Sequence, residues 1–147
     1  MTVRRASVLE IGSIVSLYAA FFREDGISTP EAAIRDNLGK MLEDSRACVF
    51  VAEENGALIG LSSGSLTFGV EFGCVAELED LYVVPAARGR GWASKLASAV
   101  LDWAVTEGAS DVVLVIASEA ERDQALTRFY GKLGFRDSRR ITMYRVP

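Results

Sequence analysis

Residues 88–93 read Arg88-Gly89-Arg90-Gly91-Trp92-Ala93 and lie between an apolar run at residues 74–84 and an amphipathic run at residues 91–105. The first pattern predicts a long strand and the second predicts a helix. A helix N-terminus leaves free N–H groups and carries a partial positive charge, and glycines let the backbone approach an anion closely. This turn is therefore predicted to bind phosphate oxygens, with Arg88 and Arg90 adding charge-assisted hydrogen bonds.

Hydrophobic periodicity predicts further elements on both sides of this turn. A capping box at Ser7 to Glu10 predicts the start of one helix, Thr29-Pro30 the start of a second, and Asn55-Gly56 a hairpin turn. Strands are predicted at residues 3–6, 48–52, 57–67, 74–84, 111–117 and 141–146, and later helices at 91–105 and 121–133.

The resulting order is β-α-α-β-β-β-α-β-α-β. It predicts an α/β fold of the mixed α+β kind, a central mixed sheet of six or seven strands with helices on both faces. The unit from Cys74 to Ala117 is expected to form a right-handed parallel crossover.

Composition narrows the range of functions. The 147 residues suffice for one ordinary domain, residues 1–147. The chain contains no histidine, which excludes a Ser–His–Asp triad and a His-ligated zinc site, so no metal is expected. The net charge of −4 argues against nucleic acid as a partner. No apolar run is long enough to cross a membrane, and no signal peptide is visible, so a cytoplasmic location is expected.

Two motifs carry a resemblance to a known family. The run Val83-x-Pro85-x-x-Arg88-Gly89-x-Gly91-x-Ala93 resembles the acetyl-CoA binding motif of the GNAT superfamily of N-acetyltransferases. Residues 125–135, which end in Phe-Tyr-Gly-Lys-Leu-Gly-Phe, look like the second signature of that family. The resemblance implies an acetyltransferase that uses acetyl-CoA as co-substrate.

The resemblance also implies where the cofactor binds. In the family it lies between two splayed parallel strands, which correspond here to residues 77–84 and 112–117. The pantetheine amides are expected to pair with the backbone near Leu81, Tyr82 and Val83, and the N–H of Val83 is the expected oxyanion donor. The pyrophosphate is expected on the N–H groups of Arg88 to Ser94. Ser118 stands where the family often has asparagine and is expected to substitute for it. The complete set of expected cofactor-binding residues is Leu81, Tyr82, Val83, Arg88, Gly89, Arg90, Gly91, Trp92, Ala93, Ser94 and Ser118.

Acid–base roles follow from the same resemblance. Tyr130 matches the tyrosine that protonates the departing thiolate, although its position also suits a core aromatic. Glu79 is the first candidate for the base and Glu77 the second, with water as a relay. Strand alternation puts these two glutamates on one face and Asp80 on the other, unless a bulge intervenes. The alternative is that the carboxylates only hold a cationic substrate.

The acceptor is the least determined part. The resemblance places its site on the first two helices and the connection before residue 74, with Phe22, Glu24 and Asp80 as candidate contacts. A primary amine of a small molecule is the leading prediction. Acetylation of a protein lysine or N-terminus, and a non-catalytic acyl-CoA-binding domain, are the alternatives. Because dimers are common among related proteins, a homodimer is left open.

Overall fold

The computed structural model describes residues 2–147, apart from the side chains of residues 123 and 124. The chain divides into two compact units, Met1–Val113 and Leu114–Pro147, and each is described by itself. That the whole chain forms one domain stays a prediction.

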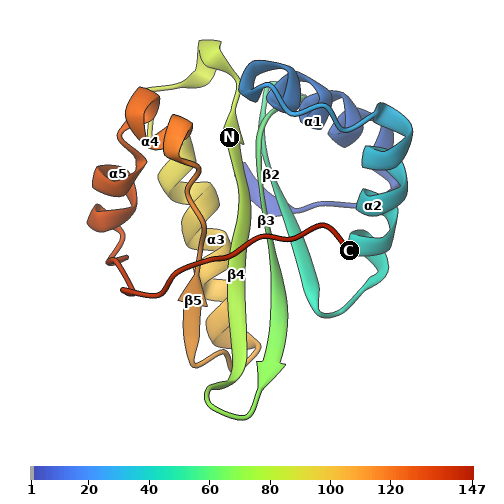
Figure 1. Ribbon diagram of the computed structural model, residues 1–147. Helices are drawn as coiled ribbons and strands as arrows, with labels where there is room; N and C mark the ends of the chain where they lie inside the picture. Colours follow the sequence, from blue (N-terminus) through green and yellow to red (C-terminus); the bar gives the residue numbers. More distant parts are fainter. Residues whose placement is uncertain (1) are drawn as a thin grey trace. The chain divides into compact units, whose positions relative to one another are not determined.

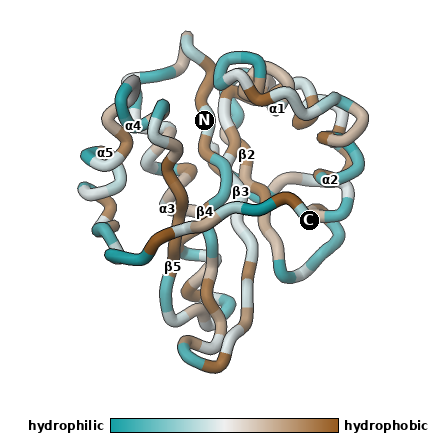
Figure 2. Tube along the Cα trace, in the orientation of Figure 1, coloured by the Kyte–Doolittle hydropathy of each residue, from teal (hydrophilic) through white to brown (hydrophobic). Residues whose placement is uncertain are grey.

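The first unit is built on a mixed sheet in the order β1-β2-β3-β4-β5 (Figure 1). Strands β1 to β4 are antiparallel neighbours, and β5 runs parallel to β4, which confirms the parallel pairing expected there. Hydrophobic residues follow the strands and the helix α3 in Figure 2. The strands are β1 (Thr2–Arg5), β2 (Ala47–Glu54), β3 (Ala57–Gly69), β4 (Gly73–Val83) and β5 (Asp111–Val113).

The sheet has five strands, so the prediction of six or seven was wrong. Within residues 2–147, the apolar segment at 141–146 forms no strand, and Ile141 and Met143 are 89% and 90% exposed. The predicted strand at 111–117 ends at Val113. Alternating hydrophobicity describes a half-buried strand, but a strand forms only where a neighbour supplies backbone hydrogen bonds. An apolar pattern in these segments does not by itself supply such a neighbour.

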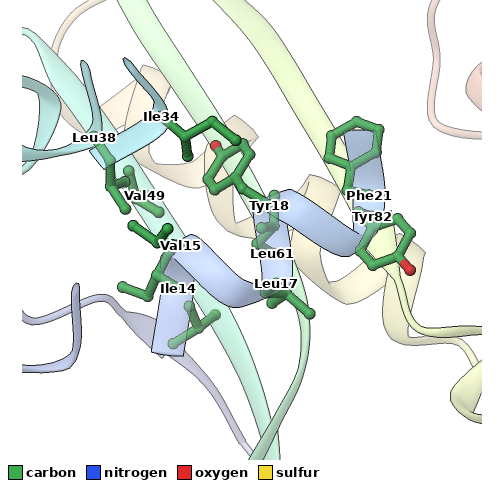
Figure 3. Close-up of a cluster of buried hydrophobic side chains, with 11 residues drawn as sticks. Ile14, Val15, Leu17, Tyr18, Phe21, Ile34, Leu38, Val49, Leu61 and Tyr82 are labelled. Carbon is green, nitrogen blue, oxygen red and sulfur yellow. The ribbon is translucent and has the colours of Figure 1, made fainter. Parts of the chain in front are cut away.

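Helices α1 (Ile11–Asp25) and α2 (Glu31–Glu43) cover one face of this sheet. The capping box is confirmed: the Ser7 hydroxyl accepts from the N–H of Leu9, and the Glu10 carboxylate accepts from the N–H of Ser7. A short 3-10 turn, η1 (Val8–Glu10), precedes α1. The core on this face joins both helices to β2, β3 and β4 (Figure 3).

Helix α3 (Trp92–Thr106) covers the opposite face and packs very closely on β3. A Cβ added at Gly64 would lie 2.9 Å from Val100 Cγ1 and 3.0 Å from the Glu77 carbonyl oxygen, and one at Gly60 would lie 2.8 Å from Leu96 Cδ1. Such separations are below van der Waals contact, so these glycines set the distance between the helix and the sheet.

Gly64→Ala should therefore lower the free energy of unfolding by about 1–3 kcal/mol, the usual cost of overpacking a core. The matched control is Gly39→Ala in α2, where the new Cβ meets only Ile11 Cδ1 at 3.8 Å. Because alanine is more favourable than glycine in a helix interior, the free energy of unfolding of that variant should rise by up to about 1 kcal/mol. Urea denaturation followed by circular dichroism measures both, and equal effects would contradict the close packing.

The second unit contains two short helices, α4 (Ser118–Gln124) and α5 (Leu126–Lys132). The single helix predicted at 121–133 was wrong in this respect. Ala125 has a φ of 50° and interrupts the helix with a left-handed residue. The break is stabilised locally, because the Glu121 carboxylate accepts from the N–H of Thr127 at 2.7 Å, in the manner of a new helix start.

Candidate active site

Within Met1–Val113, no strand pairs with one edge of β4 along the second half of that strand. Within the described part of the chain, β5 pairs with β4 only as far as Glu77. The N–H of Val84 donates to the Ile59 carbonyl across β3. Because neighbouring residues of a strand direct their N–H groups to opposite edges, the N–H of Val83 faces the open edge. Arg88 Nε donates to the Val83 carbonyl from the same side at 2.8 Å. This edge therefore offers the backbone groups expected to pair with pantetheine.

The turn after β4 presents a row of unused N–H groups. It begins with a short 3-10 turn, η2 (Pro85–Ala87), and continues through Gly89 and Gly91, whose φ angles are 77° and 83°. Among residues 2–147, the N–H groups from Gly89 to Ser94 donate to no protein acceptor, and the first donor of α3 is the N–H of Lys95, to the Gly91 carbonyl. A Cβ at either glycine would meet nothing within 4 Å. Free N–H groups at a helix N-terminus beside open space are suited to bind an anion, and the binding of the pyrophosphate here stays a prediction.

Trp92 anchors this turn rather than lining it. Its side chain is 2% exposed and packs with Val83, Ala87 and Leu96 beneath α3. The indole of Trp92 is therefore not available to a phosphate. The indole fixes the start of the helix against the sheet. Ala93 packs at the edge of the same cluster.

Both arginines of the turn are paired with carboxylates. Arg88 Nη2 donates to Glu24 of α1 at 2.9 Å, and Arg90 donates through two nitrogens to Glu54 of β2 at 2.9 and 3.0 Å. These ion pairs are partly exposed, and such pairs contribute about 0–1 kcal/mol. A pyrophosphate can therefore compete for the guanidinium groups, and their role as phosphate ligands stays a prediction.

A β-bulge gathers three carboxylates on one face of β4. Ser63 pairs with Asp80 but Gly64 pairs with Leu78, so Glu79 is the extra residue. A bulge interrupts the alternation of side chains. Asp80 consequently faces the α1 side, where it accepts from Tyr18, instead of the side opposite Glu79. The structure therefore brings together Glu77, Glu79 and Asp80 on one face. Simple strand alternation would have put Asp80 on the opposite face, and the bulge is the reason that it does not.

The surroundings of Glu79 raise the pKa of its carboxyl. Ser65 Oγ donates to its carboxylate at 2.9 Å, which holds the group against β3. The partial burial of this carboxyl raises the pKa of Glu79 above its ordinary value. The Ser65 hydrogen bond lowers that pKa, and the neighbouring Asp80 and Glu77 carboxylates raise it. A raised pKa brings a carboxylate closer to the range in which it accepts protons efficiently.

Asp80 lies in a network that sequence reasoning missed. Tyr18 Oη donates to Asp80 Oδ2 at 2.9 Å, and Ser63 Oγ donates to the same oxygen at 2.6 Å. Tyr18 is 5% exposed and Ser63 is fully buried. The one available signal was polarity at core positions: Tyr18 on the apolar face of a helix and the serines at 62–65 within an apolar strand.

The C-terminal end of α1 supplies the other predicted acceptor residues. Phe22 packs into the aromatic cluster, with its ring edge-on to Tyr18 at 5.5 Å, so it supports the core. The Tyr82 ring stacks on the Phe21 ring, with 5.0 Å between the ring centroids (Figure 3). The Arg88 guanidinium carbon lies over the Tyr82 ring, 5.6 Å from its centroid. Burial raises the pKa of Tyr82, and the Glu24 carboxylate raises it further. Glu24 thus joins the end of α1 to the turn after β4 through Arg88.

Comparison with known proteins decides the family. Residues 11–135 match the Acetyltransferase (GNAT) family. The chain belongs to this family.

Relatives and solved structures agree with the assignment. An uncharacterized N-acetyltransferase, YhfO, of Bacillus subtilis is 33% identical over 78% of this chain and 77% of its own length. An aminoglycoside N(6')-acetyltransferase type 1 of Serratia marcescens is 29% identical over 76% of this chain and 77% of its own length. The aminoglycoside N-acetyltransferase AAC(6')-Iy in complex with CoA has the same fold, with a TM-score of 0.84, 23% identity and coverage of 99% of this chain and 93% of that one. The protein is thus an N-acetyltransferase.

The second GNAT signature lies in the second unit. Tyr130 is on α5, 8% exposed, and its ring meets Phe129 and Phe135 edge-on at 5.0 and 5.7 Å. These contacts fix the ring plane, while the role of its hydroxyl as acid stays a prediction. Ser118 is the first residue of α4 and is exposed, and its contact with the cofactor also stays a prediction.

The described residues offer neither a reactive thiol at Cys48 nor a cluster suited to a metal ion. Cys48 is 1% exposed, and burial raises the pKa of its thiol to about 12, so it is a poor nucleophile. Across the described residues, no group of three or more acidic or cysteine side chains could hold a metal ion. None of the described helices combines the length and hydrophobicity that a membrane span requires.

Proposed function

We propose that this chain transfers the acetyl group of acetyl-CoA to a primary amine of a small molecule. The observation that carries the proposal is the strand β4, which bears three carboxylates on one face and leads directly into the turn of free N–H groups. Within residues 2–147, no lysine or arginine pairs with Glu77, Glu79 or Asp80. Uncompensated carboxylates attract a cation, and the similar aminoglycoside N(6')-acetyltransferase supports a small amine over a peptide.

The reaction is a direct transfer within a ternary complex. Glu79, or Glu77 through water, takes a proton from the bound ammonium, and the free amine nitrogen attacks the thioester carbonyl carbon. The N–H of Val83 stabilises the negative charge that develops on the carbonyl oxygen. The C–S bond then breaks, and Tyr130 donates its proton to the leaving thiolate. The nitrogen loses its second proton through water, and this proton restores the Tyr130 hydroxyl. The products are the acetylated amine and CoA, and no acyl-enzyme forms.

Tyr130→Phe should lower kcat by about tenfold and leave the KM for acetyl-CoA within about twofold. The effect is modest because a thiol has a pKa near 8.5, so its thiolate leaves without full protonation. The matched control is Tyr144→Phe, which also removes a phenol hydroxyl from the second unit. Tyr144 is 89% exposed, so this change should leave kcat unaltered. Steady-state thiol release measures both variants, and an unchanged kcat in Tyr130→Phe across pH 6–9 would remove the hydroxyl from the mechanism.

The proposal is tested by thiol release from acetyl-CoA with a panel of amines. The panel contains neamine, 1,4-diaminobutane, an aromatic monoamine and a lysine-containing peptide. Amine-dependent thiol release, with the acetylated product identified by mass spectrometry, is the expected result. Turnover of the peptide alone would replace the proposal with protein acetylation. CoA binding without turnover of any acceptor would favour the non-catalytic alternative.

A further inference from the structure

The hydrogen bonds at Asp80 leave one of its two oxygens unused. Tyr18 and Ser63 both donate to Oδ2, and among the described residues no donor reaches Oδ1. Burial and the Asp80 charge raise the pKa of Tyr18 well above 10, so its hydroxyl remains protonated and acts as the donor. The two hydroxyls come from different elements, α1 and β3, and together they fix the orientation of the carboxylate.

The surroundings of Asp80 provide no counter-charge. On its own strand the neighbouring ionisable groups are the carboxyls of Glu79 and Glu77 and the phenol of Tyr82. From α1 it faces the phenol of Tyr18. From β3 it faces the neutral hydroxyl of Ser63. No cation of the described chain pairs with it. A half-buried carboxylate without a cationic partner is costly to the folded protein, and such a cost is retained mainly where a ligand uses the group.

We propose that Tyr18 and Ser63 are positioning residues that hold Asp80 Oδ2, so that Oδ1 receives a second cationic group of the acceptor. This inference rests on the proposed function. Glu79 serves the amine that is acetylated, and Asp80, the next residue on the same face of the bulge, holds another ammonium of the same molecule. The acceptor class is therefore a diamine or polyamine rather than a monoamine.

The experiment compares 1,4-diaminobutane with 1-aminobutane, which share a carbon chain and differ by one ammonium. At saturating acetyl-CoA, the wild type should show a higher kcat/KM for the diamine. This preference should fall at least tenfold in Asp80→Asn and about threefold to tenfold in Tyr18→Phe and in Ser63→Ala. Adding Tyr18→Phe to Asp80→Asn should cause no further fall, because Tyr18 acts through Asp80.

The matched control is Ser62→Ala. Ser62 is also fully buried, but its hydroxyl donates to the Leu96 carbonyl on the opposite side of β3. Ser62→Ala removes a buried hydrogen bond, as Ser63→Ala does. A general loss of packing would therefore affect the diamine preference of both variants. A positioning role of Ser63 changes that preference only in Ser63→Ala. Thermal melting of each variant confirms that the compared proteins are folded.

The outcomes separate this inference from the proposed function. A wild type without diamine preference, or a preference that Tyr18→Phe and Ser63→Ala leave unchanged, overturns the positioning role even though acetylation stands. If the wild type acetylates neither amine, the proposed function fails for this class. Calorimetric affinities of the two amines for the CoA-bound protein then replace the rates, with the same expected ratios and the same result overturning the inference.

Discussion

Glu79→Gln is expected to lower kcat by about 10²–10⁴-fold, the usual contribution of a positioned general base. The change keeps the size of the side chain and its capacity to accept from Ser65, but glutamine cannot take a proton. The matched control is Glu43→Gln at the exposed end of α2, which should retain wild-type rates. Thiol release at saturating acetyl-CoA measures both variants with the best acceptor of the panel.

The pH dependence gives the same prediction a second readout. A base acts in its deprotonated form, so kcat/KM for the amine should rise as pH passes upward through the pKa of Glu79. Burial and the adjacent carboxylates raise that pKa above the ordinary value of a glutamate, so the midpoint of this limb should lie above that ordinary value. The limb should disappear in Glu79→Gln. If it persists there and disappears in Glu77→Gln, Glu77 is the base, and if it persists in both, neither glutamate is.

The features that sequence alone predicted are those specified by a few adjacent residues. The capping box at Ser7, the turn at Asn55-Gly56 and the left-handed glycines after β4 each depend on local backbone chemistry. The parallel pairing of β4 with β5 was also predicted, because a strand–helix–strand unit has few alternatives. The family motif at residues 83–93 covers the end of β4, the glycine turn and the start of α3.

Features that depend on distant partners were not predicted. The bulge at Glu79 exists only in the register of β4 against β3, and neither strand specifies it alone. The pairs of Arg88 with Glu24 and of Arg90 with Glu54 join residues far apart in the chain. The break at Ala125 had no glycine or proline to signal it. Sequence reasoning therefore identified the carboxylates but not the residues that orient them.

Gly91→Val should raise the Kd for CoA by about 10–100-fold, which corresponds to about 1.4–2.8 kcal/mol. Gly91 has a φ of 83° and precedes the first turn of α3. A β-branched residue disfavours this backbone, so the free N–H groups from Gly89 to Ser94 would no longer converge, and its side chain would enter the open space above them.

The matched control is Gly108→Val at the other end of the same helix. Gly108 has a φ of 79° and open space around it, so the substitution imposes a similar backbone strain. Both variants should lose about 1–2 kcal/mol of stability, the cost of a left-handed non-glycine residue, but only Gly91→Val should weaken CoA binding in calorimetry. Equal Kd values for the two variants would mean that the turn does not hold the pyrophosphate. A loss confined to Gly91→Val would instead assign the anion site to backbone geometry rather than to the arginines, which both variants retain.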